Sequence, residues 1–314
     1  MSAAQLPLRD GTTPLAQLID AYMAAYAGRD TTRAQRLAFW RGALGHRPFG
    51  EVNDDEIHAA REQLAQQRGR VYSGRDAEGK VILRAKRNRL SGPTLNRYTV
   101  ALSAVFTWAI RQRIAPRNFA NPVRAVPALP ESPGTVRFLS DDERERLLAA
   151  CRASKWERLW LLVMLAITTG ARRSELTGMR WRDLDLERRV AHVARTKNGE
   201  PKVMPLVPAV LAELQRFAPA AKPEALVFPA RLRPDHPMAI EDRWRQALRA
   251  ARVQRFRFHD LRHTCASYLA QHGASLLEVA DVLGHKTVRM AARYSHLSAG
   301  HRAALVERVM GGIK

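Results

Sequence analysis

The second half of this 314-residue chain is organised around LWLLVMLAITTGARRSEL, residues 159–176. The first ten of these residues are almost wholly apolar, so they predict a helix that is buried on every side. The run is well short of the ~20 apolar residues that a membrane span requires, which indicates a core helix of a soluble protein. Gly170 is expected to end this helix, and the next helix carries ARRSELTGM.

On either side of this helix, local patterns predict a mixed domain. Ser140 and Glu143 form a capping box, in which the hydroxyl and the carboxylate bind free amides, so a helix should begin there. Alternating apolar residues over 190–207, with an Asn-Gly pair at 198–199, are typical of an antiparallel hairpin. We therefore expect a small antiparallel sheet in this region.

Two further helices are predicted near the end of the chain. They cover about 259–272 and 276–283, and Gly284 ends the second. Ser275 and Glu278 form another capping box in front of that second helix.

The first part of the chain has the periodicity of a small helical bundle. Helical patterns cover about 14–27, 31–43, 54–68 and 92–113. In the last of these, the apolar positions at helical spacing are Leu95, Tyr98, Leu102, Val105, Ala109 and Ile110. Residues 69–90 separate the third and fourth helices, and their glycines indicate a loop or a short hairpin.

Prolines separate the two parts. Five of them, Pro116, Pro122, Pro127, Pro130 and Pro133, fall in one short stretch that cannot continue a helix. We expect an N-terminal tail at 1–13, a helical domain at 14–125, a linker at 126–137 and a second domain at 138–314. The predicted fold is mainly α with a small antiparallel β-sheet, in two domains.

The charge points to a polyanionic partner. Lys and Arg number 52 against 30 Asp and Glu, and the net charge of +22 exceeds what solubility needs. Ten cations and no acidic residue lie between Glu78 and Glu131. Double-stranded DNA is the expected partner, and the candidate contacts within this stretch are Arg84, Lys86, Arg87, Arg89 and Arg97.

Interpretations of these cations that involve no DNA also stay open. They could form a solvated basic face, and those at 69–90 could belong to a mobile surface loop. A membrane-surface patch is disfavoured because the cations are mixed with core residues instead of lying on one strongly amphipathic helix.

The cysteines and the start of the chain indicate a cytoplasmic protein, which would be associated with the nucleoid. Cys151 and Cys265 are far apart in apolar surroundings, so reduced core thiols are expected. The sequence starts with MSAAQLPLRDG, which has no apolar signal core.

Four short segments of the second domain concentrate the residues that could carry chemistry. They are TGARRSEL (169–176), RTKNGE (195–200), HDLRH (259–263) and LGHKTVRMAARYSH (283–296). Arg172 lies at a helix start, where an anion is favoured, and Glu175 is one turn along and could hold its guanidinium. Lys197 precedes the expected turn, so its ammonium would sit at a hairpin tip.

Each of these features has an ordinary explanation when taken alone. Arg172 and Glu175 could be a structural ion pair, and a lone buried Tyr294 is normally a core residue. His259 and Arg262, however, share one helical face and could grip one anion. Phosphoryl transfer depends mostly on positioning and on cations that stabilise charge on the non-bridging oxygens, so the combination is more specific than its parts.

In order, spacing and local context, the four segments resemble the motifs of the tyrosine recombinases, the phage-integrase family of site-specific DNA recombinases. The resemblance covers most of residues 136–300. The helical first part is similar, with a weaker sequence signal, to the core-site DNA-binding domain of that family. It implies an α+β tyrosine-recombinase catalytic domain preceded by a helical core-site DNA-binding domain.

The resemblance also implies a role for each matching residue. Arg172 and Arg262 would clamp the scissile phosphate, and His285 would donate a hydrogen bond to a non-bridging oxygen. Lys197 resembles the general acid for the departing 5′ oxygen, while His259 matches a position assigned to acid-base help. Tyr294 resembles the nucleophile that forms a 3′-phosphotyrosine.

By the same resemblance, the reaction needs no metal, cofactor or ATP, and the chain has no P-loop pattern. The protein would work as a homotetramer on paired DNA sites, with an accessory bending or directionality factor as a possible partner. Integration or excision of a mobile element is preferred over chromosome-dimer resolution, which the sequence does not exclude. The chain begins almost at the first helical bundle, so an additional arm-site-binding domain is not expected.

The tail after Tyr294 could couple protomers. Its apolar stripe consists of Leu305, Val309, Met310 and Ile313. Docking on a neighbouring protomer and docking on its own domain stay open, because an amphipathic helix does not specify its groove.

Three rival interpretations use the same residues. His259 and His263 have the i, i+4 spacing of a zinc helix, but Asp260 replaces the usual Glu and Arg262 would place a cation beside the metal. A DNA-binding protein without catalysis would explain the charge, and Tyr294 decides against it. A type IB topoisomerase is closest in chemistry, but the two-domain layout and the context LGH…RYSH favour recombination.

Overall fold

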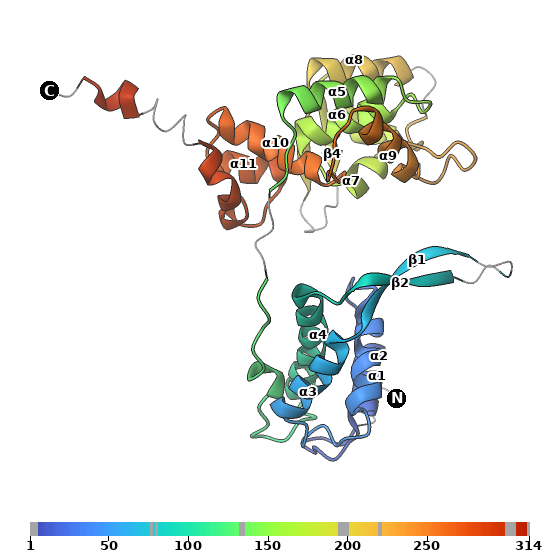
Figure 1. The fold of residues 1–314 in the computed structure, drawn as a ribbon, viewed down its shortest axis with the longest axis vertical. Helices are drawn as coiled ribbons and strands as arrows, with labels where there is room; N and C mark the ends of the chain where they lie inside the picture. Colours follow the sequence, from blue (N-terminus) through green and yellow to red (C-terminus); the bar gives the residue numbers. More distant parts are fainter. Residues whose placement is uncertain are drawn as a thin grey trace. The chain divides into compact units, whose positions relative to one another are not determined.

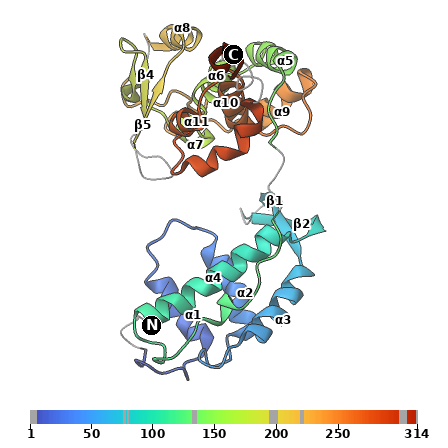
Figure 2. The ribbon, with the colours of Figure 1, turned by 90° about the vertical axis from the view of Figure 1, so that its left-hand side faces the viewer.

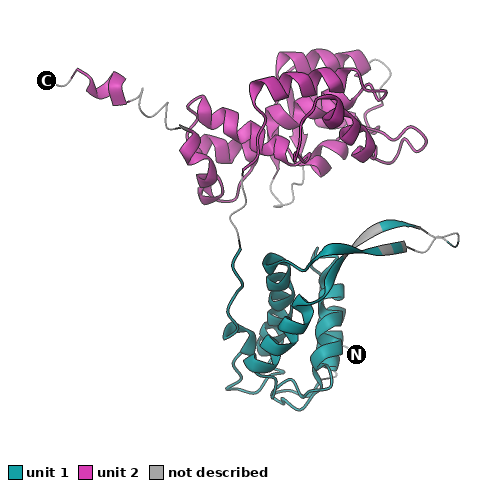
Figure 3. Cartoon of the chain, in the orientation of Figure 1, with its two compact units in different colours: residues 1–133 teal, residues 134–314 magenta. Residues whose placement is uncertain are grey.

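The computed structural model describes residues 6–75, 78, 81–131, 136–193, 201–218, 222–298 and 306–312. The chain forms two compact units, residues 1–133 and 134–314 (Figure 3). The division falls inside the proline-rich stretch. Lys197 and the Asn-Gly pair at 198–199 lie outside the described residues, so the structure says nothing of the predicted turn.

In the described part of the first unit there are four α-helices and one short 3₁₀ helix. Their bounds are α1 (Leu15–Ala24), α2 (Arg33–Leu44), α3 (Asp54–Ala65), α4 (Gly92–Arg111) and η2 (Pro122–Arg124). All four predicted helices are present, with ends within a few residues of those expected. On α4, Leu95, Leu102, Val105 and Ala109 are buried as the spacing predicts. Ile110 is exposed instead, because it directly follows the buried Ala109 on the helix and so faces away from the core.

Residues 69–90 contain a longer hairpin than the sequence indicated. Strand β1 (Arg68–Arg75) pairs antiparallel with β2 (Val81–Arg89), and the ribbon projects from the helices of its unit (Figure 1). Two register irregularities interrupt the pairing. The side chains of Arg84, Lys86, Arg87 and Arg89 on β2 are exposed, and so is Arg97 on α4.

The start of the expected linker is held by the first unit. Arg61 on α3 donates a hydrogen bond to the Pro127 carbonyl, with 2.6 Å between Nη1 and the oxygen. Asn96 on α4 donates to the Leu129 carbonyl and accepts from the Leu129 amide, each at 2.9 Å. Residues 127–129 therefore follow the surface of the helical bundle.

The second unit surrounds one apolar helix. Around α6 (Leu159–Thr169) pack α5 (Asp141–Arg152), α7 (Arg173–Thr177), α8 (Pro208–Phe217) and α10 (Asp260–Gln271) (Figure 2). The unit also contains α9 (Glu241–Ala250), α11 (Leu276–Leu283) and the 3₁₀ helices η3 (Trp181–Asp183), η5 (Val288–Met290) and η6 (Ala292–Ser298). Nearly every α6 residue is buried, as predicted, and both expected capping boxes are present at the starts of α5 and α11.

A small antiparallel sheet lies in the same unit, as the alternation over 190–207 predicts. It has the order β3 (Leu184–Asp185), β4 (Val190–Val193), β5 (Lys202–Pro205). The chain as a whole is mainly helical with small antiparallel sheets, which confirms the predicted fold class.

Gly170 determines how the chain leaves α6. Its φ of +59° is in the left-handed region, which favours glycine. A Cβ at this position would lie 2.3 Å from Cδ2 of Leu283 and 3.3 Å from Sγ of Cys265. The turn into α7 can therefore pass close to α10 and α11, which brings Arg172 near both helices.

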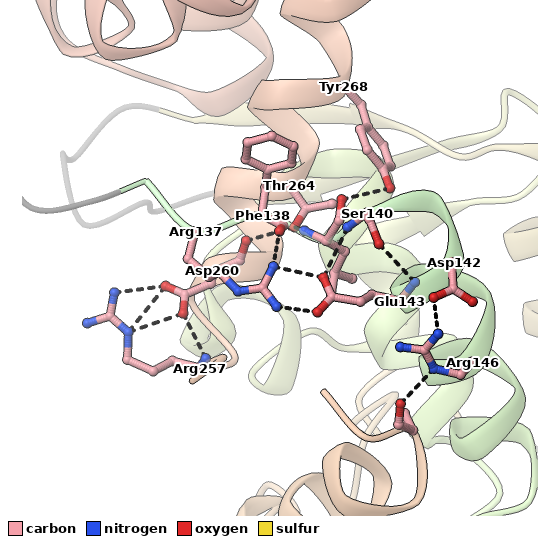
Figure 4. A network of polar contacts seen from close by, with 12 residues as sticks. Arg137, Phe138, Ser140, Asp142, Glu143, Arg146, Arg257, Asp260, Thr264 and Tyr268 are labelled. Atoms are coloured by element: carbon pink, nitrogen blue, oxygen red, sulfur yellow. Dashed lines mark hydrogen bonds and ion pairs between the residues drawn. The ribbon is translucent and has the colours of Figure 1, made fainter. Parts of the chain in front are cut away.

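A polar network fixes the start of α10 in the second unit (Figure 4). Thr264 Oγ1 accepts a hydrogen bond from the Leu139 amide at 3.2 Å, and Tyr268 donates to the Leu139 carbonyl. Asp260 is 1% exposed and accepts hydrogen bonds from the amide and the guanidinium of Arg257. Asp260 therefore stabilises the start of α10.

Both cysteines are buried and unpaired, as expected. Among the described residues, no helix is long and apolar enough to span a membrane.

Candidate active site

Arg172 lies at the turn between α6 and α7, where Glu175 holds it. Its guanidinium Nη1 is 2.8 Å from Oε1 of Glu175, and its backbone amide donates to Oε2 at 2.9 Å. The side chains are 18% and 5% exposed, so the pair is shielded from water. The predicted pair is thus present. Because α7 has only five residues and Glu175 already caps it, the guanidinium itself is the group that can bind an anion.

Arg262 is fixed from the core side. Its side chain is buried, and Nη1 donates to the Gly170 carbonyl at 2.7 Å. Burial, followed by the nearby Arg172 cation, lowers the pKa of Arg262 to about 10. Two cations so close together in a shielded place favour an anion between them.

His259 and His285 come to the same place from different elements. His259 immediately precedes α10, and burial of its ring, with a further contribution from Arg262, lowers its pKa. His285 follows Gly284, which ends α11 with a φ of +64°. Burial and the cations Arg262 and Arg172 lower the pKa of His285 to about 4. Its Nδ1 atom is buried and has no hydrogen-bond partner among the described residues.

Tyr294 lies on η6 and is 2% exposed. Its hydroxyl oxygen is 2.6 Å from Nδ1 of His263, which is on α10. Burial raises the pKa of the phenol, while the cations Arg293 and Arg262 act in the opposite direction. The phenol is therefore protonated near neutral pH and held by an imidazole.

These side chains line one pocket of about 150 Å³. The lining residues are Arg172, His259, Arg262, His263, His285, Met290, Arg293 and Tyr294. Five of the six residues proposed from the sequence for catalysis thus meet, although they come from segments up to 122 residues apart. The sixth, Lys197, lies outside the described residues.

The five candidate DNA contacts on β2 and α4 belong to the first unit. They are exposed, as a phosphate-binding surface requires, but they do not contribute to this pocket.

Sequence reasoning missed two residues near this pocket. His263 was named from the sequence only for its zinc-like spacing from His259, and its contact with a hydroxyl 31 positions away has no local signal. Lys202 on β5 is 9% exposed, and its Nζ atom donates to the Thr169 carbonyl at 3.0 Å. Strand alternation could have found it, since Lys202 shares the inward side with buried Met204 while Val203 points out.

The zinc interpretation of His259 and His263 finds no support in the geometry. Nδ1 of His263 is already bound to the Tyr294 hydroxyl, and Asp260 is bound to Arg257. In the part of the chain that the structure describes, no group of three or more His, Cys, Asp or Glu side chains could hold a metal ion.

The phage integrase family model matches residues 137–301, which is more than half of the chain. The chain belongs to the phage integrase family. The chain is 30% identical to the shufflon-specific DNA recombinase of Escherichia coli over 211 residues. The match covers 67% of this chain and 52% of that protein. It spans about half the length of the curated relatives that it matches first.

Solved structures have the same fold as this phage integrase family member. A Tn1549 transposon integrase in complex with a circular intermediate DNA superposes with a TM-score of 0.68 at 20% identity, covering 95% of this chain and 100% of that one. A lambda integrase tetramer bound to a Holliday junction gives 0.63 at 21% identity, covering 93% and 80%.

Proposed function

We propose that this protein is a site-specific DNA recombinase that cleaves and rejoins DNA strands through Tyr294. The observation that carries the proposal is the pocket in which the Tyr294 hydroxyl, Arg172 and Arg262 lie together. A catalytically inactive DNA-binding protein would need the basic surface but not a buried phenol beside two guanidiniums.

In this proposal the pocket receives the scissile phosphate. Arg172 and Arg262 are each held by an oxygen of the protein, from Glu175 and Gly170, so their guanidiniums are oriented before DNA arrives. Preoriented donors stabilise the charge that develops on non-bridging oxygens without reorganising during the reaction. His285, which also lines the pocket, adds a ring N–H donor, and His259 provides acid-base help beside Arg262.

Tyr294 then forms a covalent bond with the DNA. Its hydroxyl oxygen attacks phosphorus, the bond to the 5′ oxygen breaks, and a 3′-phosphotyrosine and a free 5′ hydroxyl result. We propose Lys197 as the acid that protonates the 5′ oxygen. The new ester keeps the energy of the broken bond, so a second 5′ hydroxyl can attack it and rejoin the strand.

The same proposal assigns the partners. Double-stranded DNA is the substrate, and the exposed cations of β2, with Arg97 on α4, contact its phosphates. The lambda integrase tetramer bound to a Holliday junction and the transposon integrase bound to a circular intermediate DNA support a homotetramer that integrates or excises a mobile element. We place the protein on the nucleoid in the cytoplasm, with a directionality factor as a further partner.

Covalent capture tests the proposed function. Wild-type protein and a Tyr294→Phe variant would each be mixed with fragmented host DNA in EDTA and denatured in detergent. Any DNA that stays attached would then be sequenced. We expect an adduct with the wild type and none with Tyr294→Phe. If both proteins bind DNA before denaturation and neither retains it afterwards, even on nicked substrates made from the bound sequences, the recombinase proposal fails.

A further inference from the structure

His263 is the hydrogen-bond partner of the proposed nucleophile. The 2.6 Å between Nδ1 of His263 and the hydroxyl oxygen of Tyr294 is at the short end for a hydrogen bond of this kind. No other hydrogen bond of that hydroxyl is found among the described residues. If the imidazole donated instead, the phenolic proton would be left buried without an acceptor, so Tyr294 donates and Nδ1 accepts.

The surroundings of His263 keep its ring neutral and able to accept a proton. Burial comes first, and the neighbouring His259, Arg293 and Arg257 act in the same direction, so the pKa of His263 falls to about 4 despite Asp260. The ring of His259 lies edge-on, with 5.5 Å between centroids, and makes no hydrogen bond to Tyr294. His263, and not His259, thus has direct contact with the atom that reacts.

We propose that His263 is a further catalytic residue, the general base that takes the phenolic proton of Tyr294 during cleavage and returns it during rejoining. The inference rests on the proposed function. As the Oη–P bond forms and the P–O5′ bond breaks, the proton passes from Oη to Nδ1, and the 5′ oxygen receives its proton from the acid on the leaving side. During rejoining each proton moves back, so the imidazolium protonates the departing tyrosine oxygen.

The phosphate itself would assist this transfer. In the free protein a protonated His263 is disfavoured by its cationic neighbours. A bound phosphate adds negative charge beside the ring, which raises its proton affinity only when substrate is present. The nucleophile is therefore activated in the complex with DNA and stays a neutral phenol otherwise.

Two variants separate base catalysis from simple positioning. His263→Ala removes both the hydrogen bond and the base, whereas His263→Asn retains an acceptor that can hold the phenol but cannot take its proton. On nicked substrates made from captured sites, we expect single-turnover cleavage to fall by about 10²-fold or more in both variants. Added imidazole should restore part of the rate in His263→Ala. DNA affinity and circular dichroism of both variants should match the wild type.

A substrate with sulfur in place of the bridging 5′ oxygen shows whether His263 acts on the nucleophile or on the leaving group. Its thiolate leaves without a proton, so a residue that acts on the leaving group becomes dispensable. Both His263 variants should stay slow on this substrate. The inference is overturned if His263→Asn cleaves at the wild-type rate, or if either variant regains the wild-type rate on the sulfur substrate. In both cases a covalent adduct with the wild type still upholds the proposed function. Absence of the wild-type adduct itself would overturn both.

Discussion

Arg262 illustrates how a single side chain can link the core to the pocket. One nitrogen of its guanidinium binds the Gly170 carbonyl, and the same group lines the pocket. Lysine would keep the charge but offers one ammonium where arginine offers a planar fork.

We therefore expect Arg262→Lys to lower the rate of covalent adduct formation by about 10²- to 10³-fold, because a preoriented oxyanion donor is removed. The measurement is single-turnover cleavage of a captured site. Arg249→Lys, which replaces an exposed cation outside the pocket, is the matched control. A rate for Arg262→Lys within threefold of the control would contradict the proposed clamp.

Lys202 allows a test of stability against pH. Burial, followed by the nearby Arg262, lowers its pKa from 10.5 to about 8. Between these two values the unfolded chain holds a proton at this site that the folded chain has released, so folding becomes more favourable as pH rises.

The free energy of unfolding of the wild type should therefore rise relative to that of Lys202→Met as pH increases from 7.5 to 10.5. The shift is about 3 kcal/mol at most, from the two pKa values of Lys202. Denaturant unfolding at several pH values measures it, with the exposed Lys286→Met as control. A difference that is independent of pH would mean that burial does not lower the pKa of the Lys202 ammonium.

At the scale of elements, the end of α6 organises the second unit. The carbonyls of Thr169 and Gly170 bind Lys202 and Arg262, so cations satisfy the carbonyl end of the helix where its dipole is negative. The turn exists because Gly170 leaves room for Leu283 and Cys265.

Gly170→Ala should destabilise the protein by about 2–4 kcal/mol, because a Cβ would clash with packed side chains at a positive φ. It should also slow cleavage, since the anchor of Arg262 moves. Gly42→Ala is the control: its Cβ would meet nothing within 4 Å on helix α2, so we expect a gain of up to about 1 kcal/mol. Equal unfolding midpoints for the two variants would refute this view of the turn.

Elements with a capping box or a long apolar run could be predicted from the sequence, whereas two amphipathic helices without a capping side chain were missed. The capping boxes at Ser140 and Ser275 and the apolar run of α6 have local causes, so their positions followed. Helix α9 was missed although Trp244 and Ala247 lie at helical spacing on its buried face, since half of its residues are charged and no side chain caps its start. Helix α8 was missed although Pro208 stands at its first turn, where proline is favoured.

The residues of the site also divide into those that sequence motifs predict and those that only the packing reveals. Motif spacing brought forward Arg172, Arg262 and Tyr294, whereas the contact of Tyr294 with His263 depends on how η6 packs against α10. Tertiary packing, and not sequence proximity, selects the proton acceptor.

At the scale of the whole molecule, most of the unpaired basic surface that sequence reasoning assigned to DNA lies in the first unit. Changing Arg84, Lys86, Arg87 and Arg89 together to Gln should weaken DNA binding and make it less sensitive to salt. The slope of log affinity against log salt should fall by up to about 3.6, because each phosphate that is no longer neutralised removes about 0.9. Replacing the three arginines by lysine keeps the charge and should keep the slope. An unchanged slope for the Gln set would remove β2 from the DNA interface.

The C-terminal tail is the other feature that matters at this scale. Of the predicted stripe, Val309 and Met310 are 58% and 53% exposed, and neighbouring Val306 is 60% exposed, which is unusual for apolar side chains on one short segment. Leu305 and Ile313 lie outside the described residues. Ending the chain after Ser298 should reduce tetramer formation on paired sites if the tail docks on a neighbour. Sedimentation of the protein with DNA measures this, and an unchanged assembly would restrict the tail to its own domain.

The two units have hydrophobic cores that share no residue. A mutation that loosens one core therefore leaves the folding free energy of the other nearly intact. The proposed DNA contacts of the first unit can therefore change without disturbing the pocket of the second unit. If strand exchange is the activity, as proposed, a foreign helical unit can be grafted in front of the second unit, with the junction after Glu131, which Asn96 of the first unit still binds.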